Sequence, residues 1–167
     1  ARKVFDFARK MGMRAITTES AEAINTIEKL VKEYDIAVGF HNHPGNMSAP
    51  DYKVWNPYYI AGLVAGRDPR IGAAAETGHW QTCGLKPVEC LRVLKGRIIS
   101  AHLKDKKAFG PSHDVPYGEG VGDMKACLDE LKAQGFNGNI SIEYEYNWDN
   151  NVPEVTKCIE FVAKYGK

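Results

Sequence analysis

The sequence predicts an α/β domain built on a parallel sheet, and two observations lead to this prediction. Five short apolar runs each end in a cluster of polar residues, and a helical pattern separates each run from the next. Strict alternation of this kind implies parallel strands with helices outside the sheet. Within each run, the side chains also alternate between a larger apolar face and a smaller face that ends in a carboxylate or an imidazole. We therefore expect one common site at the carboxyl ends of the strands.

Length and composition fit a single domain of ordinary soluble type. The 167 residues carry a formal net charge of +1, and 44% of them are hydrophobic. The near-neutral charge argues against a nucleic-acid partner. No apolar run reaches the roughly 20 residues that a membrane span needs, so no membrane partner is expected. A cytoplasmic location is favoured, but Ala1 lies inside a helical pattern, so an earlier start is expected and a signal peptide is not excluded.

The four cysteines predict reduced thiols. They contain no C-x-x-C pair, and three of them fall on or near the apolar faces of expected helices. Free cysteine behaves there as a small buried hydrophobic residue. The four are Cys83, Cys90, Cys127 and Cys158.

Helices are recognised by apolar residues at spacings of three and four. Gly12 ends the first helix, and Gly96 ends the fourth. Asn56 followed by Pro57 is a cap with proline at the first helical position, and Asp123 caps the fifth helix. The expected helices span residues 1–11, 21–34, 57–64, from 87 to the stop at 96, 124–134 and 152–165.

Strands fall on short runs of β-branched and small apolar residues. The run from Ile71 to Glu76 is filled with small residues, which suits a fully buried strand. The segment 77–85 is expected to be a loop, and 104–122, with four glycines and two prolines, a long flexible one. The expected strands span residues 14–19, 36–43, 71–76, 98–103 and 140–146.

The alternation within the strands brings ionisable side chains to one end of the sheet. Small residues lie below them on the same face, which leaves room for a ligand above. Such agreement among five strands is hard to attribute to chance. The side chains are Glu19, His41, His43, Glu76, His102 and Glu143.

Carboxylate oxygens and neutral imidazoles together are a ligand set for Mn²⁺, Co²⁺, Zn²⁺ or Mg²⁺. Without a cation, neighbouring carboxylates repel one another, and one of them must hold a proton. Open coordination positions would receive two oxygens of a substrate, and the ion would polarise a carbonyl and stabilise an enediolate. A neighbouring carboxylate could then move the proton next to that carbonyl.

Three blocks of sequence resemble the sugar phosphate isomerase/epimerase family, the xylose-isomerase-like TIM-barrel group. They are residues 75–80 (AETGHW), 97–105 (RIISAHLKD) and 141–145 (SIEYE). The His-Asn-His-Pro run at 41–44 and the segment 114–120 strengthen the likeness, the first pointing to a His-Asn-His-Pro subgroup. The resemblance covers nearly the whole chain, 1–167. It implies a single (β/α)₈ barrel domain of which the chain supplies the last five β–α units and lacks the first three. A smaller open sheet is the alternative.

The resemblance also implies a ligand set and a catalytic pair. Family members usually have Asp where Glu76 stands, and many have Glu where His41 stands. In epimerases of the family, the residues matching Glu143 and His41 exchange the substrate proton. Histidine at 41 leaves one carboxylate base, so isomerisation, or dehydration or β-elimination on a keto-sugar or keto-glycoside, fits at least as well as two-base epimerisation. Glu19 or His43 is an alternative ligand to His41. The four implied ligands are His41, Glu76, His102 and Glu143.

Five further side chains are expected to contact a small carbohydrate substrate. Lys104 follows the fourth strand and suits an anionic or hydroxyl-rich ligand; its alternative role is to pair with an acid. His79 could instead stabilise the turn at Gly78, and His43 could order its loop. The five are Glu19, His43, His79, Lys104 and His113.

Two other classes of protein stay open. A non-catalytic sugar-binding or oligomerising barrel fragment would expose sheet edges near Ile16 and Ile142. A second copy or a missing N-terminal segment would then complete the barrel. A DNA-repair nuclease with a multi-zinc site belongs to the same superfamily, but the neutral charge and only five histidines weigh against it.

Overall fold

Five parallel strands form one sheet in chain order. The computed structural model describes residues 1–45 and 49–166. The order β1-β2-β3-β4-β7 places every strand beside its predecessor, as in a barrel wall, whereas a doubly wound sheet reverses direction part-way. The predicted parallel α/β fold is therefore confirmed. The strands are β1 (Ala15–Thr18), β2 (Ala37–His41), β3 (Ile71–Glu76), β4 (Ile98–Leu103) and β7 (Asn139–Ile142).

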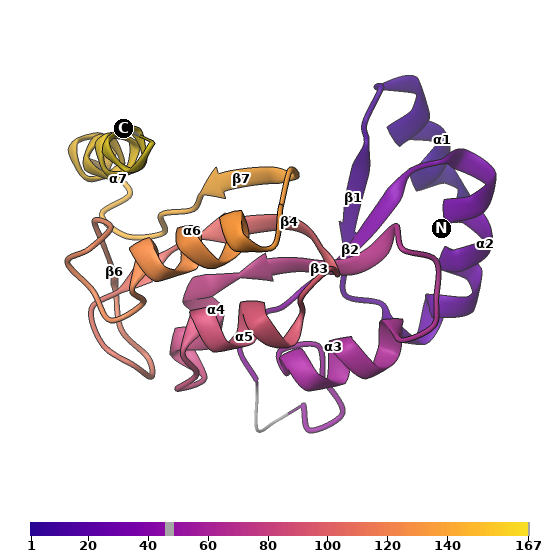
Figure 1. Cartoon of the computed structure of the whole chain (residues 1–167), viewed down its shortest axis with the longest axis horizontal. Helices are drawn as coiled ribbons and strands as arrows, with labels where there is room; N and C mark the ends of the chain where they lie inside the picture. The colour runs from indigo at the N-terminus through magenta and orange to yellow at the C-terminus, as the bar shows by residue number, and fades with distance from the viewer. Residues whose placement is uncertain (46–48, 167) are drawn as a thin grey trace.

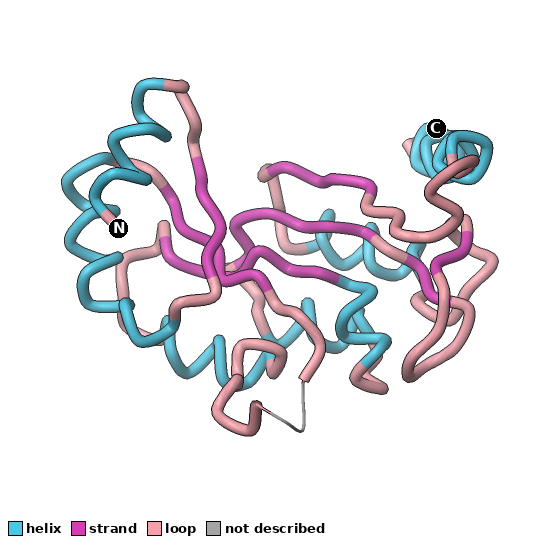
Figure 2. Tube along the Cα trace, turned by 180° about the vertical axis from the view of Figure 1, so that it is seen from behind, coloured by secondary structure: helices cyan, strands magenta, loops and turns pink. Residues whose placement is uncertain are grey.

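Helices follow the strands and lie along the outside of the sheet (Figure 1). The two termini lie at opposite ends of the molecule, with the N-terminal helices beside β1 and β2 and the last helix beyond β7 (Figures 1 and 2). Asn56 caps the third helix as predicted, since its side chain accepts the Tyr58 N–H. The helices are α1 (Arg2–Lys10), α2 (Ile24–Tyr34, after the 3₁₀ turn Ala21–Ala23), α3 (Pro57–Val64), α4 (Thr77–Thr82), α5 (Pro87–Val93), α6 (Met124–Ala133) and α7 (Val152–Tyr165).

The alternation predicted for the strands separates a core face from an open face. Val38 and Phe40 of β2, and Leu103 of β4, are fully buried in the core against the helices. A hollow of about 850 Å³ extends from Arg14 and Arg70 past Ser100 to His102. Among the described residues, β1 and β7 are the edge strands of the sheet, because each has a neighbouring strand on one side only. Closure of the sheet into a barrel stays a prediction.

The helices and the cysteines agree with the predictions on membrane spans and buried thiols. In the described part of the chain, no helix is both long enough and apolar enough to cross a membrane. All four cysteines are free, and Cys90, Cys127 and Cys158 are buried as predicted. Cys83 is partly exposed and accepts the Gly45 N–H at 3.3 Å.

The segment 77–85 is not the predicted loop, because α4 begins directly at the end of β3. The Glu76 carboxylate accepts the Gly78 N–H at 2.7 Å and thereby caps the helix. Trp80 and Gln81 are buried on it. Glu76 is both the last residue of β3 and the N-cap of α4, so the sequence contains no turn signal between the strand and the helix.

The segment 104–122 is also more ordered than predicted. Two short antiparallel strands, β5 (Asp105–Lys106) and β6 (Asp114–Val115), lie within it. The Asp105 carboxylate, 1% exposed, accepts three backbone N–H groups, from Gly118, Gly120 and Gly122. A Cβ on Gly120 would lie 2.3 Å from Asp105 Oδ1, so this glycine permits a close approach rather than flexibility.

The last strand ends earlier than the predicted residue 146. Its final ladder bond runs from the Glu143 N–H to the Leu103 carbonyl at 3.0 Å. The Glu145 N–H then donates to the Asp114 carboxylate at 2.6 Å, which takes the chain away from the sheet. Ile140, expected on the covered apolar face, is 40% exposed because β7 is an edge strand.

We expect Gly72→Ala to destabilise the fold and Gly62→Ala not to. A Cβ on Gly72 in β3 would lie 2.0 Å from the Arg97 carbonyl oxygen, and neither backbone can yield cheaply. The expected loss is about 1–3 kcal/mol or more, by analogy with overpacked cores. Gly62 lies in α3 with no atom within 4 Å of the added Cβ, so alanine there should stabilise by up to about 1 kcal/mol. Urea unfolding measures both, and equal midpoints for Gly72→Ala and wild type would contradict the contact.

Candidate metal centre and active site

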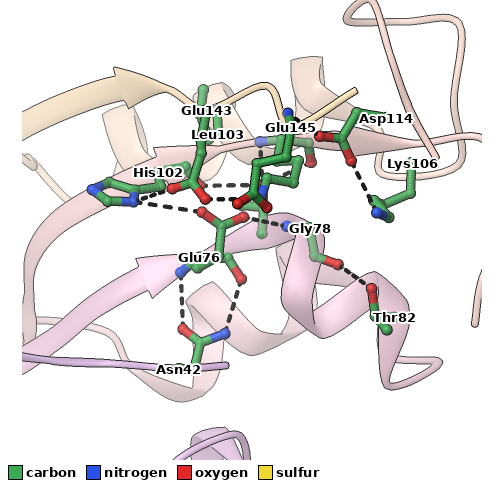
Figure 3. Close-up of polar contacts among 12 residues, drawn as sticks. Asn42, Glu76, Gly78, Thr82, His102, Leu103, Lys106, Asp114, Glu143 and Glu145 are labelled. Carbon is green, nitrogen blue, oxygen red and sulfur yellow. Dashed lines mark hydrogen bonds and ion pairs between the residues drawn. The ribbon is translucent and has the colours of Figure 1, made fainter. Parts of the chain in front are cut away.

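Three ionisable side chains meet at the carboxyl ends of β3, β4 and β7. The strand register pairs Glu76 with His102 across β3 and β4, and Leu103 with Ile142 across β4 and β7. His102 Nδ1 lies 2.6 Å from one Glu143 oxygen and 3.6 Å from Glu76 Oε2 (Figure 3). One ligand atom from each of Glu76, His102 and Glu143 lies within 4.8 Å of the others. The structure thus brings together three of the four residues that were predicted to hold a metal.

Glu76 is the most deeply buried acid of this group. Its side chain is fully buried, one oxygen accepts the Gly78 N–H, and Oε2 has no hydrogen-bond partner among the residues that the structure describes. Burial, with repulsion from Glu143, raises the pKa of Glu76 well above its ordinary value, although Lys104 acts in the opposite direction. Without a further cation, the protonated form of Glu76 is favoured.

Asn42 holds the backbone of Glu76 from the neighbouring strand. Its side chain donates to the Glu76 carbonyl and accepts the Glu76 N–H, both at 2.9 Å (Figure 3). The amide thus extends the pairing of β2 with β3 beyond the end of β2. Asn42 is not among the residues predicted from the sequence to belong to the site. The feature of the sequence that could have indicated it is its position between the two histidines of the His-Asn-His-Pro run.

Lys104 supplies a buried positive charge among the acids. Its side chain is 1% exposed, and its ammonium group donates to Glu143 Oε1 at 2.8 Å and to Glu145. Burial alone would lower the pKa of Lys104, but attraction to Glu76 and bonds to Glu143 and Glu145 outweigh it and raise the pKa above its usual value. Lys104 is therefore charged and takes the alternative role of pairing with acids. Its contact with substrate stays a prediction.

Glu143 is held in the opposite protonation state from Glu76. Its hydrogen bond with His102 is the largest cause that lowers its pKa; burial opposes this, and Lys104 lowers the pKa further. As a result, the pKa of Glu143 lies far below the ordinary carboxyl value. Two neighbouring carboxyl groups whose environments separate their pKa values in this way can divide acid and base roles between them.

The end of β3 and the start of α4 position Lys104. Thr77 Oγ1 accepts the Lys104 N–H at 2.8 Å, and Gln81 Nε2 donates to the Lys104 carbonyl at 2.8 Å. A Cβ on Gly78 would lie 2.3 Å from Lys104 Cδ, so only glycine lets the lysine stem pass. Thr77 and Gln81 have no recognisable role in the sequence, because their partners lie more than 20 residues away in the chain.

A second cluster consists of His41, His43 and His79. Their ring centres are 4.8 Å apart for His41 and His43, 4.9 Å for His43 and His79, and 5.9 Å for His41 and His79. One ligand atom from each lies within 4.8 Å of the others. His41 falls in this group rather than with Glu76 and Glu143, although its ring centre is 5.2 Å from that of His102. Its role as a fourth ligand of the first group stays a prediction.

The histidine cluster is neutral at its inner members. Burial, with the neighbouring cationic side chains, lowers the pKa of His79 to about 3 and also lowers that of His41. His43 Nδ1 bonds Glu19 at 2.9 Å. Burial tends to raise the pKa of Glu19, but its bonds with His43 and Tyr52 make the net shift downward. Neutral imidazoles with fixed orientation are available as ligands or hydrogen-bond partners.

His113 lies apart from both clusters. It is exposed just before β6, and its ring centre is 4.6 Å from that of Tyr146. It belongs to none of the groups of described residues that could hold a metal. Its predicted contact with substrate rests on the loop sequence alone.

We expect Lys104→Met to destabilise the protein most at neutral and alkaline pH. The lowered pKa of Glu143 gives stability above the ordinary carboxyl pKa near 4.5, and this stability is lost as the pH falls toward its folded-state pKa. The variant keeps the bond with His102 but lacks the part of that contribution that comes from Lys104, and it leaves the acids without their cation. Its deficit relative to wild type should therefore be about 3–5 kcal/mol at pH 7 and shrink below pH 4.5. Urea unfolding from pH 3.5 to 8 measures this. Lys107→Met, at an exposed lysine, is the matched control, and a pH-independent deficit would contradict the charge argument.

Comparison with known proteins gives matches over almost the whole chain. The sequence pattern of the family described as "Xylose isomerase-like TIM barrel" matches residues 4–165. An uncharacterised protein from Parabacteroides distasonis is similar in structure, with 36% sequence identity and a TM-score of 0.67, over 97% of this chain and 62% of that one. A protein described as D-tagatose 3-epimerase-like gives a TM-score of 0.77 at 21% identity, over 98% of this chain and 66% of that one.

A curated relative shares a shorter segment. The L-ribulose-5-phosphate 3-epimerase of Salmonella paratyphi A is 37% identical over 73 residues, which are 43% of this chain and 25% of that protein. The chain thus matches about a quarter of the Salmonella epimerase and spans a little under two thirds of the Parabacteroides distasonis protein.

Proposed function

This chain belongs to the xylose isomerase-like TIM barrel family, and from that premise we propose that it is an enzyme that moves a proton next to the carbonyl group of a small sugar with the help of a divalent metal ion. The names of its epimerase relatives support the reaction class. The observation that carries the proposal is the convergence of Glu76, His102 and Glu143 at one end of the sheet. The substrate in this proposal is a small carbohydrate and no nucleic acid takes part.

The donor set fits Mn²⁺, Co²⁺, Zn²⁺ or Mg²⁺ through two carboxylates and one imidazole. Glu76 Oε2 is buried without a partner, at a cost that an ion would remove. Bound there, an ion would polarise a substrate carbonyl and stabilise the negative charge that develops on its oxygen. The same charge would favour the ionised form of Glu76.

Glu143 is the proposed base. It stays ionised because His102 and Lys104 both bond it, so it is in the state that accepts a proton. A bound sugar would displace water around this carboxylate, and desolvation raises the pKa of an acid and therefore its basicity. We propose that four side chains hold the substrate hydroxyl groups, namely those of Glu19, His43, His79 and Lys104. His113, which lies apart from them, is a further candidate for contact with substrate.

β-Elimination on a keto-sugar or keto-glycoside is the second candidate reaction. The carboxylates Glu76, Glu143 and Glu145 come from the ends of β3 and β7, whereas the end of β2 offers His41. A reaction that needs one carboxylate base suits this asymmetry better than an exchange between two carboxylates. His41 would then act as a catalytic partner through its neutral imidazole, which can hydrogen-bond the oxygen on the leaving side.

Barrel closure is a separate part of the proposal. We propose that residues 1–167 form one domain equivalent to the last five β–α units, with strands from a second copy or from a preceding segment beside β1 and β7. Both edge strands present unpaired backbone groups in the described chain.

Deuterium exchange tests the proposed reaction. Incubated in D₂O with Mn²⁺ and a panel of ketopentoses, ketohexoses and their phosphates, the protein should incorporate deuterium next to the carbonyl of its substrate. Glu143→Gln should lower the exchange rate by about 10²–10⁴-fold, as loss of a general base does. Glu119→Gln, at an exposed acid, should leave the rate unchanged.

NMR of the products separates the candidate reactions. A new epimer or aldose indicates isomerase chemistry, and an unsaturated ketone indicates elimination. Exchange that survives both Glu143→Gln and removal of metal by a chelator would contradict the proposal.

A further inference from the structure

The side chain of Gln81 is fully buried, and its amide bonds the backbone of two residues that follow β4. Nε2 donates to the Lys104 carbonyl at 2.8 Å, and Oε1 accepts the Lys106 N–H at 2.9 Å. Nε2 also donates to the Thr77 carbonyl at 3.2 Å, within the same helix. Both N–H groups and the oxygen of this amide are therefore engaged, all of them by backbone groups.

The backbone of Lys104 is held by α4, because β4 ends one residue earlier. Thr77 Oγ1 accepts the Lys104 N–H at 2.8 Å, and the Gln81 amide bonds the Lys104 carbonyl. Thr77 and Gln81 lie one helical turn apart, so they share a face of α4. Between them, Gly78 lets the lysine stem pass, since a Cβ there would lie 2.3 Å from Lys104 Cδ. We call Thr77, Gly78 and Gln81 the lysine seat.

Building on the proposed function, we propose that Gln81 and Thr77 are positioning residues of the reaction, which act on the proposed base through the ammonium group of Lys104. Lys104 Nζ donates to Glu143 Oε1 at 2.8 Å, and Glu143 Oε2 lies 2.6 Å from His102 Nδ1. Each oxygen of the base thus has one partner, and the lysine seat determines where the first of these partners stands.

A lysine needs such a seat because its ammonium group is carried on a flexible four-carbon stem. Bonds at the tip alone would leave the base of the stem free to move. The seat fixes the N–H and the carbonyl of Lys104 and confines the stem against Gly78. A displacement of about 1 Å in a reacting group can cost roughly 10²-fold in rate, so the seat has a measurable consequence for the proposed reaction.

The same helix end also places a proposed metal ligand. Glu76 is the N-cap of α4, and its carboxylate accepts the Gly78 N–H at 2.7 Å. The first two turns of α4 therefore hold both the buried acid and the lysine that neutralises its neighbours. A shift of this helix would move the two charges together, which keeps their separation constant.

The glycine-rich segment 104–122 encloses the Gln81 side chain in turn. A Cβ on Gly122 would lie 2.5 Å from Gln81 Nε2, and the Gly110 N–H donates to the Gln81 carbonyl at 3.0 Å. The amide is thus closed off from solvent. A side chain without an amide would take from the Lys104 carbonyl and the Lys106 N–H the partner that they have in this enclosed place, which carries a free-energy cost.

Nitrogen-15 NMR of lysine ammonium groups tests the seat in the full chain, without metal or substrate. A buried ammonium group bonded to two carboxylates exchanges its protons slowly with water, so Lys104 should give an observable signal. Lys104→Met identifies that signal by its absence. Gln81→Met keeps the size of the side chain but lacks the amide, and it should broaden the signal beyond detection.

The threonine of the seat supplies a second pair of variants. Thr77→Val removes the acceptor of the Lys104 N–H and should also abolish the signal. The conservative Thr77→Ser keeps the hydroxyl and should restore it. This pair decides the question even where Gln81→Met does not fold, and circular dichroism checks the fold of every variant.

Gln134 offers a matched control, because its amide makes the same kind of bonds elsewhere. Its Nε2 donates to the Leu91 carbonyl at 2.9 Å, and its Oε1 accepts the Gly96 N–H at 3.4 Å. Gln134→Met should leave the Lys104 signal as in wild type. Equal loss of the signal in Gln134→Met and Gln81→Met would mean a general loosening of the fold and would overturn the positioning role.

Deuterium exchange into the sugar, with Mn²⁺ present, measures the consequence for the reaction. Gln81→Met and Thr77→Val should each lower the rate by about 10–100-fold, and Thr77→Ser should recover most of it. Gln134→Met should exchange at the wild-type rate. A lost ammonium signal with an unchanged rate would overturn the proposal, because the base would then work without a positioned lysine.

The two measurements separate this proposal from the proposed function. An ammonium signal that is absent from wild type, or unchanged in Gln81→Met and Thr77→Val, would overturn the lysine seat and leave the proposed function intact. A wild-type protein that exchanges no sugar would overturn the proposed function. The ammonium signal would still decide, in that case, whether Gln81 and Thr77 hold Lys104.

Discussion

The buried ammonium group of Lys104 allows several carboxylates to share one end of the sheet. Glu76 is fully buried, Glu143 partly buried and Glu145 exposed, and their carboxylates would repel one another without a neighbouring cation. Lys104 bonds two of them directly and attracts the third, and its own stem passes a glycine that leaves room for it. Burial of Glu76 and the bonds of Glu143 to His102 and Lys104 together determine which acid is ionised and which holds a proton.

The geometry of this site depends on backbone anchors as much as on the ionisable groups. The Asn42 amide fixes the Glu76 backbone beyond the end of β2, and the Asp114 carboxylate fixes the Glu145 N–H after β7 has ended. Asp114 is itself held by Lys106 at 2.9 Å. These side chains replace ladder bonds where strands stop, so they fix the backbone at the ends of the strands. Rigid strand ends are what a site with short ligand distances needs.

Much of the candidate site followed from periodicity. A strand alternates its side chains and parallel strands end at the same edge, so Glu76, His102 and Glu143 could be assigned to one cluster without coordinates. The same argument included His41, but the structure groups it with His43 and His79. Strand parity gives the side of the sheet on which a residue lies. It does not give the direction in which a side chain turns at the end of its strand.

The sequence by itself determined the parallel sheet, most helix boundaries and the edge where chemistry-bearing side chains gather, because these follow from local patterns and from alternation. The order of the strands came from the structure, since the pattern also allowed a smaller open sheet. Only the tertiary structure decided that Asp105 orders the glycine-rich segment, that Lys104 pairs with Glu143, and that the histidines form a cluster of their own. Each of these contacts joins residues from different elements or opposite ends of a long loop. Contacts of that kind have no periodicity along the chain, so they depend on packing that the local pattern does not specify.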